Sequence, residues 1–273
     1  LGVEGMSDLA FDPSTGNLLY SVSHWGNQIF EIREINSSGN LVDTCTHENF
    51  GSGNISMVFG RDNTLHIAND QQIFRRLPGQ TQITKVCDLP FTGTGDLEID
   101  SQGNLYLSDP FVNDIIYRIL PDGTVEIFAD HLDGVSRPYG LAMDAQDNLY
   151  VANSDPWDPS VIRLTPEGQG EPFASGGLLE PSVLDLAFDS QGNLLAACRN
   201  YHKIIRYDSE GNDTLFADSD DGLYFPASMA LIPFPCGPDF DQDSDVDGAD
   251  LAQFATAFNP QCLERFSLAF GRL

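Results

Sequence analysis

One motif recurs five times along the chain, and such a repeat constrains the fold more than any other feature of the sequence. Each copy is a short apolar run, a polar turn ending in residues such as Gly-Asn or Asp-Asn, and a leucine that opens a second apolar run. These leucines are 40 to 47 residues apart and are Leu18, Leu65, Leu105, Leu149 and Leu194. A period of this length is typical of the four-stranded blades of a β-propeller.

Each copy also contains two further runs of strand-forming residues. The pattern predicts the third strand of a blade at 115–119 and at 203–207, and the fourth strand at 124–128 and at 213–216. The runs are separated by turn sequences such as Pro-Asp-Gly and Ser-Glu-Gly, and residues 1–230 show no helical periodicity. The sequence therefore predicts an all-β propeller of four-stranded blades.

The number of blades stays open at this point. Residues 226–234 resemble the first strand of another copy, 138–143, but no second, third or fourth strand follows them. Either five blades form the ring and this strand closes it, or six blades form it. In the second case the missing strands come from a preceding segment or from a neighbouring molecule, and an open strand edge would favour polymerisation.

The repeated lines resemble the NHL-repeat and senescence-marker/gluconolactonase families of β-propellers over residues 1–235. The resemblance to the lactonases implies a divalent ion in the central channel, bound by one Glu, two Asn and one Asp. Glu4 matches the family's Glu, but Tyr139 replaces an Asn and Leu184 replaces the Asp. Because two ligand positions differ, lactonase activity is disfavoured. The resemblance is specific for the architecture and weakly specific for activity.

A second group of carboxylates is aligned by the repeat itself. The first strands begin at equivalent positions, which are Asp8, Ser56, Asp96, Gly140, Asp185 and Ser228. A propeller gathers these positions near one mouth of its channel, where three carboxylates could hold a cation or a water cluster. Alternatively, the aspartates accept hydrogen bonds from backbone N–H groups. The predicted channel site is Asp8, Asp96, Asp185 and Glu4, and no catalytic residue is predicted.

Residues 236–273 differ in composition and form a second predicted domain after the propeller of residues 1–235. The segment 239–250 has the pattern of an EF-hand loop, with carboxylates at loop positions 1, 3, 5, 7, 9 and 12, which are Asp239, Asp241, Asp243, Asp245, Asp247 and Asp250. Six carboxylates in twelve residues repel one another unless a hard cation binds them. The spacing therefore predicts a calcium site with Ca²⁺ as cofactor.

The residues behind this loop predict a small α-helical module. Leu251, Phe254, Ala255 and Phe258 follow the spacing of an amphipathic helix, which ends at Asn259-Pro260. The loop and helix resemble a dockerin-type module, whose calcium loop ends in Asp-Leu. A full dockerin has two calcium loops and this chain has one, so the resemblance implies calcium binding and does not extend to cohesin binding.

The charge excludes several classes of partner. The chain has 13 Lys and Arg against 41 Asp and Glu, a formal net charge of −28. Nucleic acids and anionic membranes are bound by clustered basic residues, so neither is an expected partner. No apolar run reaches the roughly 18 to 20 residues of a membrane span.

Five cysteines lie scattered without the spacing of a zinc site, as expected for an exported protein with one or two disulfides. The preferred predicted pair is Cys236 with Cys262. A second possible pair is Cys45 with Cys87, which leaves Cys198 free. The alternative is that all five are small buried thiols.

Motifs of hydrolytic catalysis are not found in the sequence, since G-x-S-x-G, H-E-x-x-H and G-x-x-x-x-G-K are missing. The resulting prediction is a secreted, calcium-binding and non-enzymatic binding or assembly protein at the cell exterior. Its partner is a protein or a second copy of the chain, with a glycan as a further possibility. The alternative is a metal-dependent lactonase or hydrolase of the gluconolactonase type.

The calcium loop generates a direct test. Calorimetric titration of the full chain should show one Ca²⁺ site. Replacing Asp241 and Asp243 by Asn should weaken Ca²⁺ binding about tenfold or more, because the loop loses two charged ligands. Asp122→Asn, in a predicted turn of the propeller, is the matched control and should leave the Kd unchanged. No heat of binding at millimolar Ca²⁺ would contradict the calcium site.

Overall fold

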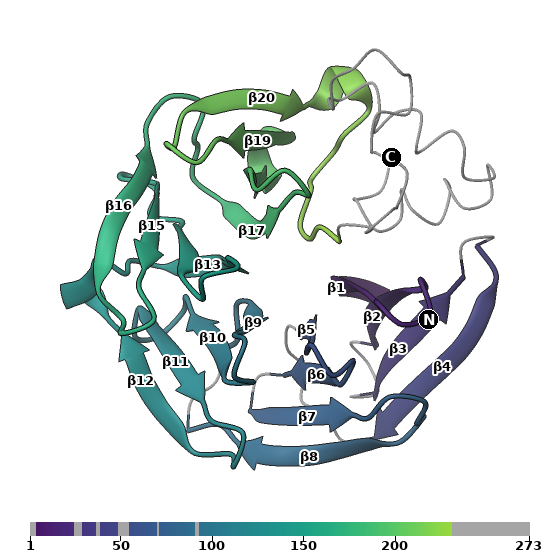
Figure 1. Ribbon diagram of the computed structural model, residues 1–273. Coiled ribbons are helices and arrows are strands. Elements are labelled where there is room, and N and C mark those ends of the chain that lie inside the picture. Colours follow the sequence, from purple (N-terminus) through teal and green to yellow (C-terminus); the bar gives the residue numbers. More distant parts are fainter. Residues whose placement is uncertain are drawn as a thin grey trace.

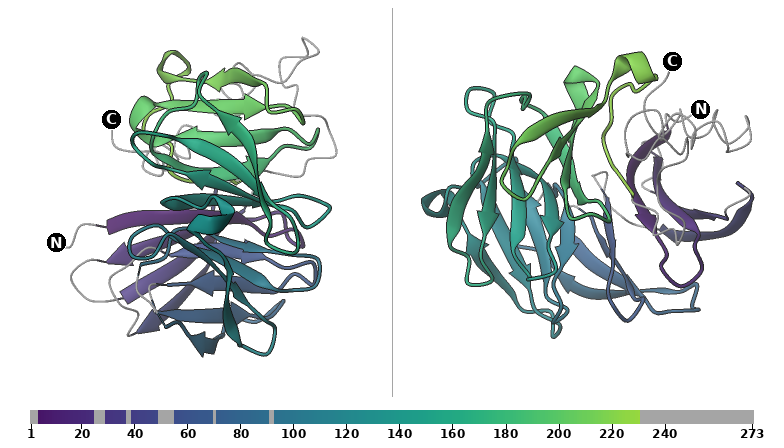
Figure 2. Two further views of the ribbon diagram at one scale, coloured as in Figure 1. Left: turned by 90° about the vertical axis from the view of Figure 1, so that its left-hand side faces the viewer. Right: turned by 45° about the horizontal axis from the view of Figure 1, so that its top comes forward.

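The computed structural model describes residues 4–24, 29–36, 39–48, 55–69, 71–90 and 93–230. Within these residues the chain forms five four-stranded antiparallel sheets arranged as blades around an axis (Figure 1). The first strand of each blade is innermost, because the first strands of successive blades contact one another. Figure 2 shows the blades from two further sides.

The strands follow chain order within each blade. Blade 1 consists of β1 (Glu4–Phe11), β2 (Leu18–His24), β3 (Ile29–Ile35) and β4 (Leu41–Glu48), and blade 2 of β5 (Ser56–Phe59), β6 (Leu65–Ala68), β7 (Gln72–Arg76) and β8 (Ile83–Asp88). Blade 3 consists of β9 (Leu97–Ile99), β10 (Leu105–Asp109), β11 (Ile115–Ile119) and β12 (Val125–Ala129), and blade 4 of β13 (Pro138–Met143), β14 (Leu149–Asn153), β15 (Ser160–Leu164) and β16 (Gly170–Ser175). Blade 5 consists of β17 (Val183–Phe188), β18 (Leu194–Cys198), β19 (Lys203–Tyr207) and β20 (Asp213–Ala217), and three 3₁₀ turns follow strands as η1 (His131–Asp133), η2 (Arg199–Tyr201) and η3 (Ser219–Asp221).

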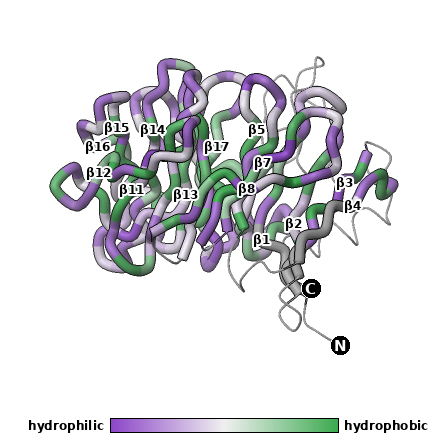
Figure 3. Tube along the Cα trace, turned by 90° about the horizontal axis from the view of Figure 1, so that it is seen from below, coloured by the Kyte–Doolittle hydropathy of each residue, from purple (hydrophilic) through white to green (hydrophobic). Residues whose placement is uncertain are grey.

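The apolar core lies between the faces of neighbouring blades. Alternate side chains of a strand point to opposite faces of its sheet, so each blade offers one apolar set to each neighbour. Between blades 1 and 2, for example, Leu19 and Ile32 pack with Leu65 and Ile67. Figure 3 shows hydrophobic stretches inside the strands and hydrophilic stretches in the connecting loops.

The polar turn of the repeat is built around an aspartate. The Asp100 carboxylate accepts hydrogen bonds from the backbone N–H of Gln102 at 2.8 Å, from that of Asn104 at 2.9 Å and from Asn104 Nδ2 at 2.7 Å. The same arrangement joins three further pairs, which are Asp144 with Asn148, Asp189 with Asn193 and Asp208 with Asn212. Part of the large negative charge therefore has a structural role in closing turns.

Hydrogen bonds of one kind make five of the six steps between successive inner segments, and they define six places around the axis. In each bond a side-chain oxygen accepts from a backbone N–H of the following place. The pairs are Asp8 Oδ2 with Met57 N at 2.6 Å, Ser56 Oγ with Leu97 N at 3.0 Å, Asp96 Oδ2 with Leu141 N at 2.8 Å, Asp185 Oδ2 with Met229 N, and Ser228 Oγ with Leu9 N at 3.2 Å. The segment 226–230 thus occupies the sixth place and closes the ring, although it is not part of a strand.

The step from blade 4 to blade 5 uses glycine instead of a polar side chain. A Cβ atom on Gly140 would lie 2.7 Å from Asp185 Cα and 2.8 Å from Asp185 C. The two inner strands therefore approach at a distance that only glycine allows. This explains why Gly stands at position 140 where the other copies have Asp or Ser.

The structure confirms the propeller of four-stranded blades and the predicted third and fourth strands. Five complete blades are present among the described residues, and the predicted extra inner strand is represented by segment 226–230. The predicted helical calcium module lies outside the described residues, as do Cys236 and Cys262. The boundary at residue 235 stays a prediction.

The predicted pairing of Cys45 with Cys87 is wrong. Cys87 is a free thiol on β8, and its side chain packs with the core between blades 2 and 3. Cys45 lies on β4 in blade 1, and blade 1 adjoins the opposite face of blade 2. Cys198 is a free, buried thiol, and a free Cys198 was also predicted from the sequence.

The hydrogen bonds of Ser228 with Asp8 and Leu9, which close the ring, predict the effect of Ser228→Ala. This change removes the hydroxyl that donates to Asp8 Oδ1 at 2.6 Å and accepts from Leu9 N, leaving buried polar groups unpaired. We expect the free energy of unfolding to fall by about 1–3 kcal/mol. Ser190→Ala, at an exposed turn of blade 5, is the matched control and should change it by less than about 0.5 kcal/mol. Equal effects of the two variants in urea unfolding would argue against closure through Ser228.

Candidate functional site

The structure brings two predicted channel carboxylates together through one hydroxyl. Ser56 Oγ lies 2.8 Å from Asp96 Oδ1 and 3.3 Å from Asp8 Oδ2. Ser228 Oγ donates to the other oxygen of Asp8 at 2.6 Å. Asp185 interacts electrostatically with both Asp8 and Asp96, so it belongs to the same cluster. We call Asp8, Asp96, Asp185 and Glu98 the axial carboxylates.

Glu4, the fourth predicted channel residue, lies on the same inner strand as Asp8. It is the first residue of β1, paired with His24 at the end of β2, and it precedes Asp8 by four residues. At about 3.3 Å per residue, four residues of extended strand span on the order of 13 Å. The described contacts thus bring Asp8, Asp96 and Asp185 together, and a cation site formed by these residues and Glu4 stays a prediction.

Glu98 is an axial carboxylate that the sequence prediction missed. Glu98 lies on β9 and follows Asp96, the residue directly before that strand, by two positions, so the alternation of side chains places both on the same side. Aligned copies have a small or aliphatic residue at this position, namely Ala10, Val58, Ala142 and Ala187. A charged residue in an otherwise apolar column of the repeat is the signal that could have revealed it.

Enclosure by the inner strands raises the pKa of every axial carboxylate. Desolvation is the largest cause, followed for Asp8 by the charge of Asp96, and the pKa of Asp8 rises to about 7. Desolvation raises the pKa of Asp96 to about 6, against hydrogen bonds that lower it. The pKa of Glu98 rises to about 8 through desolvation and the charge of Asp96. The pKa of Asp185 is also raised, first by desolvation and then by Asp96 and Asp8.

These carboxylates do not fit the channel metal site of the lactonase family. One oxygen each of Asp8, Asp96 and Asp185 accepts a backbone N–H of the next inner strand, and Asp8 and Asp96 also share Ser56. Among the described residues, no group of three or more His, Cys, Asp and Glu has an arrangement that could hold a metal ion. Tyr139, at a family Asn position, packs edge to face with Phe111 at 5.5 Å between ring centroids. Asp8, Asp96 and Asp185 are therefore groups that join neighbouring places of the ring.

Exposed apolar side chains are concentrated at the end of the propeller where the inner strands begin. The loops there join second to third strands and fourth to first strands, and we call this end the loop face. Of the 13 exposed large apolar residues among the described ones, eight lie in these loops, which are Phe111, Val112, Leu132, Trp157, Leu178, Tyr201, Tyr224 and Phe225. Large apolar side chains exposed in this number at one end are typical of an interaction surface.

The loops hold these side chains in defined positions. The carboxylate of Asp155 accepts from the backbone N–H of Trp157 at 2.8 Å, and Trp157 is 93% exposed. Lys203 Nζ lies 5.8 Å from the ring centroid of Tyr201. His202 Nδ1 accepts from the backbone N–H of Phe225 at 3.1 Å. The aromatic groups are therefore presented to solvent on loops that side-chain hydrogen bonds and ring contacts stabilise.

Comparisons with known proteins show the fold. No family model and no curated protein matches the chain. Similar solved structures include regucalcin, a calcium-binding protein from Agrobacterium tumefaciens, with a TM-score of 0.65 and 17% identity over 85% of this chain and 79% of that one. A gluconolactonase from Xanthomonas campestris has a TM-score of 0.61 and 18% identity over 80% and 77% of the two chains. A nidogen/laminin complex has a TM-score of 0.63 and 17% identity over 80% and 82%.

The axial carboxylates predict a pH dependence of stability. Because their folded pKa values are raised, their favourable contribution is complete below the unfolded pKa near 4 and is lost as the pH rises through the folded value, about 7 for Asp8. Asp8→Asn keeps an oxygen acceptor for Met57 N and removes the titration. The free energy of unfolding of Asp8→Asn minus that of the unmodified chain should therefore increase by on the order of 2 kcal/mol from pH 5 to pH 8.

Urea unfolding at pH 5, 6.5 and 8 measures this difference. Asp122→Asn is the control, because Asp122 is exposed and its pKa is lowered by bonds to Thr124. A difference between Asp8→Asn and the unmodified chain that stays constant over this range would contradict the raised pKa of Asp8.

Proposed function

We propose that this protein is a secreted, calcium-binding and non-enzymatic binding protein whose loop face contacts its partner. The observation that carries the proposal is the concentration of exposed aromatic and aliphatic side chains at this one end. Exposed apolar surface is stabilised when a partner removes it from water, at roughly 25 cal/mol per Å². Trp157, Phe111 and Tyr201 are residues of the types that dominate binding energy at interfaces.

The chemistry of the partner follows from charge. The chain has a net charge of −28, which repels polyanions at long range. A neutral or positively charged partner is therefore favoured at long range, and association of two copies has to depend on short-range apolar contact at the loop face. We propose a protein partner, with a second copy of this chain as the assembly form and a neutral glycan as the competing possibility.

Calcium and location are part of the proposal. The calcium site lies in residues 239–250, outside the described residues, and its support is the spacing of its carboxylates. Secretion is supported by the acidic, lysine-poor composition. The described residues contain no helix long and apolar enough to cross a membrane.

The alternative function is a metal-dependent hydrolase of the gluconolactonase type. It is favoured by the likeness in fold to a gluconolactonase and to regucalcin. Against it stand Asp8, Asp96 and Asp185, each of which has a carboxylate oxygen engaged in a bond to the next place of the ring.

Binding is tested with Trp157→Ala and Phe111→Ala. Sedimentation velocity of the full chain, with Ca²⁺ and with EDTA, measures assembly of copies, and an array of neutral glycans measures glycan binding. We expect Ca²⁺-dependent assembly that each variant weakens about tenfold or more, as for central aromatic residues of an interface. Leu77→Ala, 40% exposed on the turn between β7 and β8 at the opposite end, is the matched control and should bind normally.

The results of these experiments distinguish a protein partner, a glycan partner and a hydrolase. Glycan binding without assembly would replace the protein partner by a glycan. Metal-dependent turnover of a panel of lactones that Glu4→Gln abolishes would show the hydrolase instead. A monomer under both conditions that binds no glycan would contradict both forms of partner measured here.

A further inference from the structure

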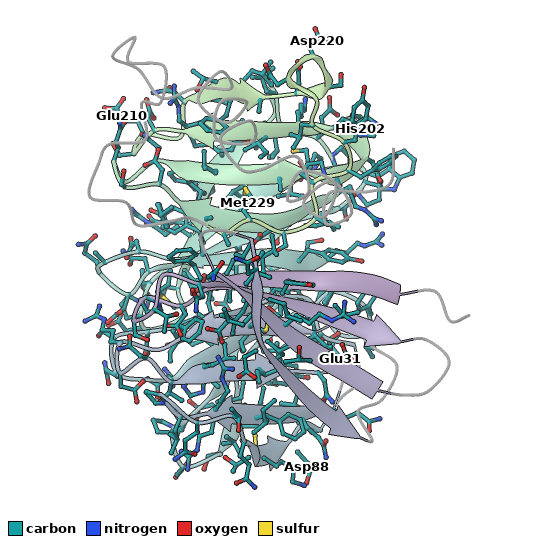
Figure 4. The ribbon with its side chains drawn as sticks, turned by 90° about the vertical axis from the view of Figure 1, so that its right-hand side faces the viewer. Glu31, Asp88, His202, Glu210, Asp220 and Met229 are labelled. Atoms are coloured by element: carbon teal, nitrogen blue, oxygen red, sulfur yellow. The ribbon has the colours of Figure 1, made fainter. Side chains whose placement is uncertain are left out.

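The sixth place of the ring is only partly filled by the described residues. On the side of blade 5, segment 226–230 and the preceding turn supply Leu223 and Met229, which cover Leu195, Ile204 and Ala217. Figure 4 shows Met229 against blade 5, with Glu31 on blade 1 across the ring closure. Blade 1 forms the other wall of this place.

The face of blade 1 toward the sixth place is less covered than the equivalent face of every other blade. This face is opposite to Leu19 and Ile32, which pack on blade 2. It carries Leu18, Tyr20 and Ile35, and all three are partly exposed. At the position of Leu18 the other blades have leucines that are 0–3% exposed, which are Leu65, Leu105, Leu149 and Leu194.

The same contrast holds at the other two positions. Residues equivalent to Tyr20 are fully buried at 0%, namely Ile67, Leu107, Val151 and Ala196. Residues equivalent to Ile35 are 0–7% exposed, namely Arg76, Ile119, Leu164 and Tyr207. Further out on this face, Leu41 is 51% exposed. The face thus keeps the apolar residues of a blade interface without the complete cover that such an interface has.

Its occupant must also meet charged groups. The Arg33 guanidinium pairs with Glu31 at 2.8 Å on this face. The other blades have an apolar residue at the position of Arg33, and the equivalents are Phe74, Tyr117, Ile162 and Ile205. An amphipathic element, with an apolar stripe and polar flanks, fits such a face better than a fully apolar strand does.

We propose that residues 231–273 dock on this face through the predicted amphipathic helix of Leu251, Phe254, Ala255 and Phe258. The chain leaves the described residues at Ala230, inside the sixth place, and 43 residues follow. The other blades run 29 to 37 residues from the end of the first strand to the end of the fourth. The segment is therefore long enough, and its attachment at the site gives it an effective concentration that a separate molecule lacks.

A photo-crosslinker tests the occupant directly. The full chain is made with p-benzoylphenylalanine in place of Tyr20 or Ile35, and crosslinked peptides are identified by mass spectrometry. We expect crosslinks within one molecule to residues 251–258, at several-fold higher yield than from the same label at Leu77, at the opposite end. Crosslinks between two copies, or a yield equal to that of the control, would overturn the proposal.

A second pair of variants tests whether the crosslink depends on the apolar stripe of the predicted helix rather than on the label itself. Phe254→Asp places a charge on the apolar stripe, whereas Gln253→Asp places it beside the stripe. With the label at Ile35, Phe254→Asp should abolish the intramolecular crosslink and Gln253→Asp should retain it. Retention of the crosslink in Phe254→Asp would contradict docking through this helix. Near-ultraviolet circular dichroism confirms that each labelled chain keeps the propeller.

Discussion

The structure depends on polar side chains at five of the six inner places, each of which accepts a backbone N–H of the next place in the ring. Blades pack mainly through apolar faces, and apolar contact is non-directional. The bonds from Asp8, Ser56, Asp96, Asp185 and Ser228 add direction, because each fixes the height of one inner strand against the following one. Among the described residues these bonds join six places, of which five carry complete blades.

The use of carboxylates for these bonds has an electrostatic cost. Desolvation raises the pKa of each of these carboxylates, and the charge of Asp96 raises the pKa of Asp8, Glu98 and Asp185 further. The similar fold of gluconolactonases places this chain beside enzymes, but a fold hosts many functions. In this protein the aspartates at the axis are explained by the architecture. The loops at one end, rather than the axis, carry the exposed groups suited to recognition.

Much of the fold could be predicted from the sequence, because the period of the leucines and the polar turns both reflect local chemistry. The Asp–Asn turns are closed by residues within four positions of each other, which is why they are visible as a motif. The grouping of Asp8, Asp96 and Asp185 followed from aligning the copies. The role of Glu4 rests on the family resemblance alone, and it stays a prediction. Cys87 was paired wrongly because which face of a blade a thiol occupies depends on packing between blades.

The contact between Ser228 and Asp8 joins residues 220 positions apart in the chain. Blades 1 to 5 can add to one another in order as the chain leaves the ribosome, since each contacts the blade before it. The circle itself becomes complete only after residue 228 has been synthesised. Until then, the first inner strand keeps Leu9 N–H without its acceptor, so an arrested or truncated nascent chain is an open arc of blades with both ends available to chaperones.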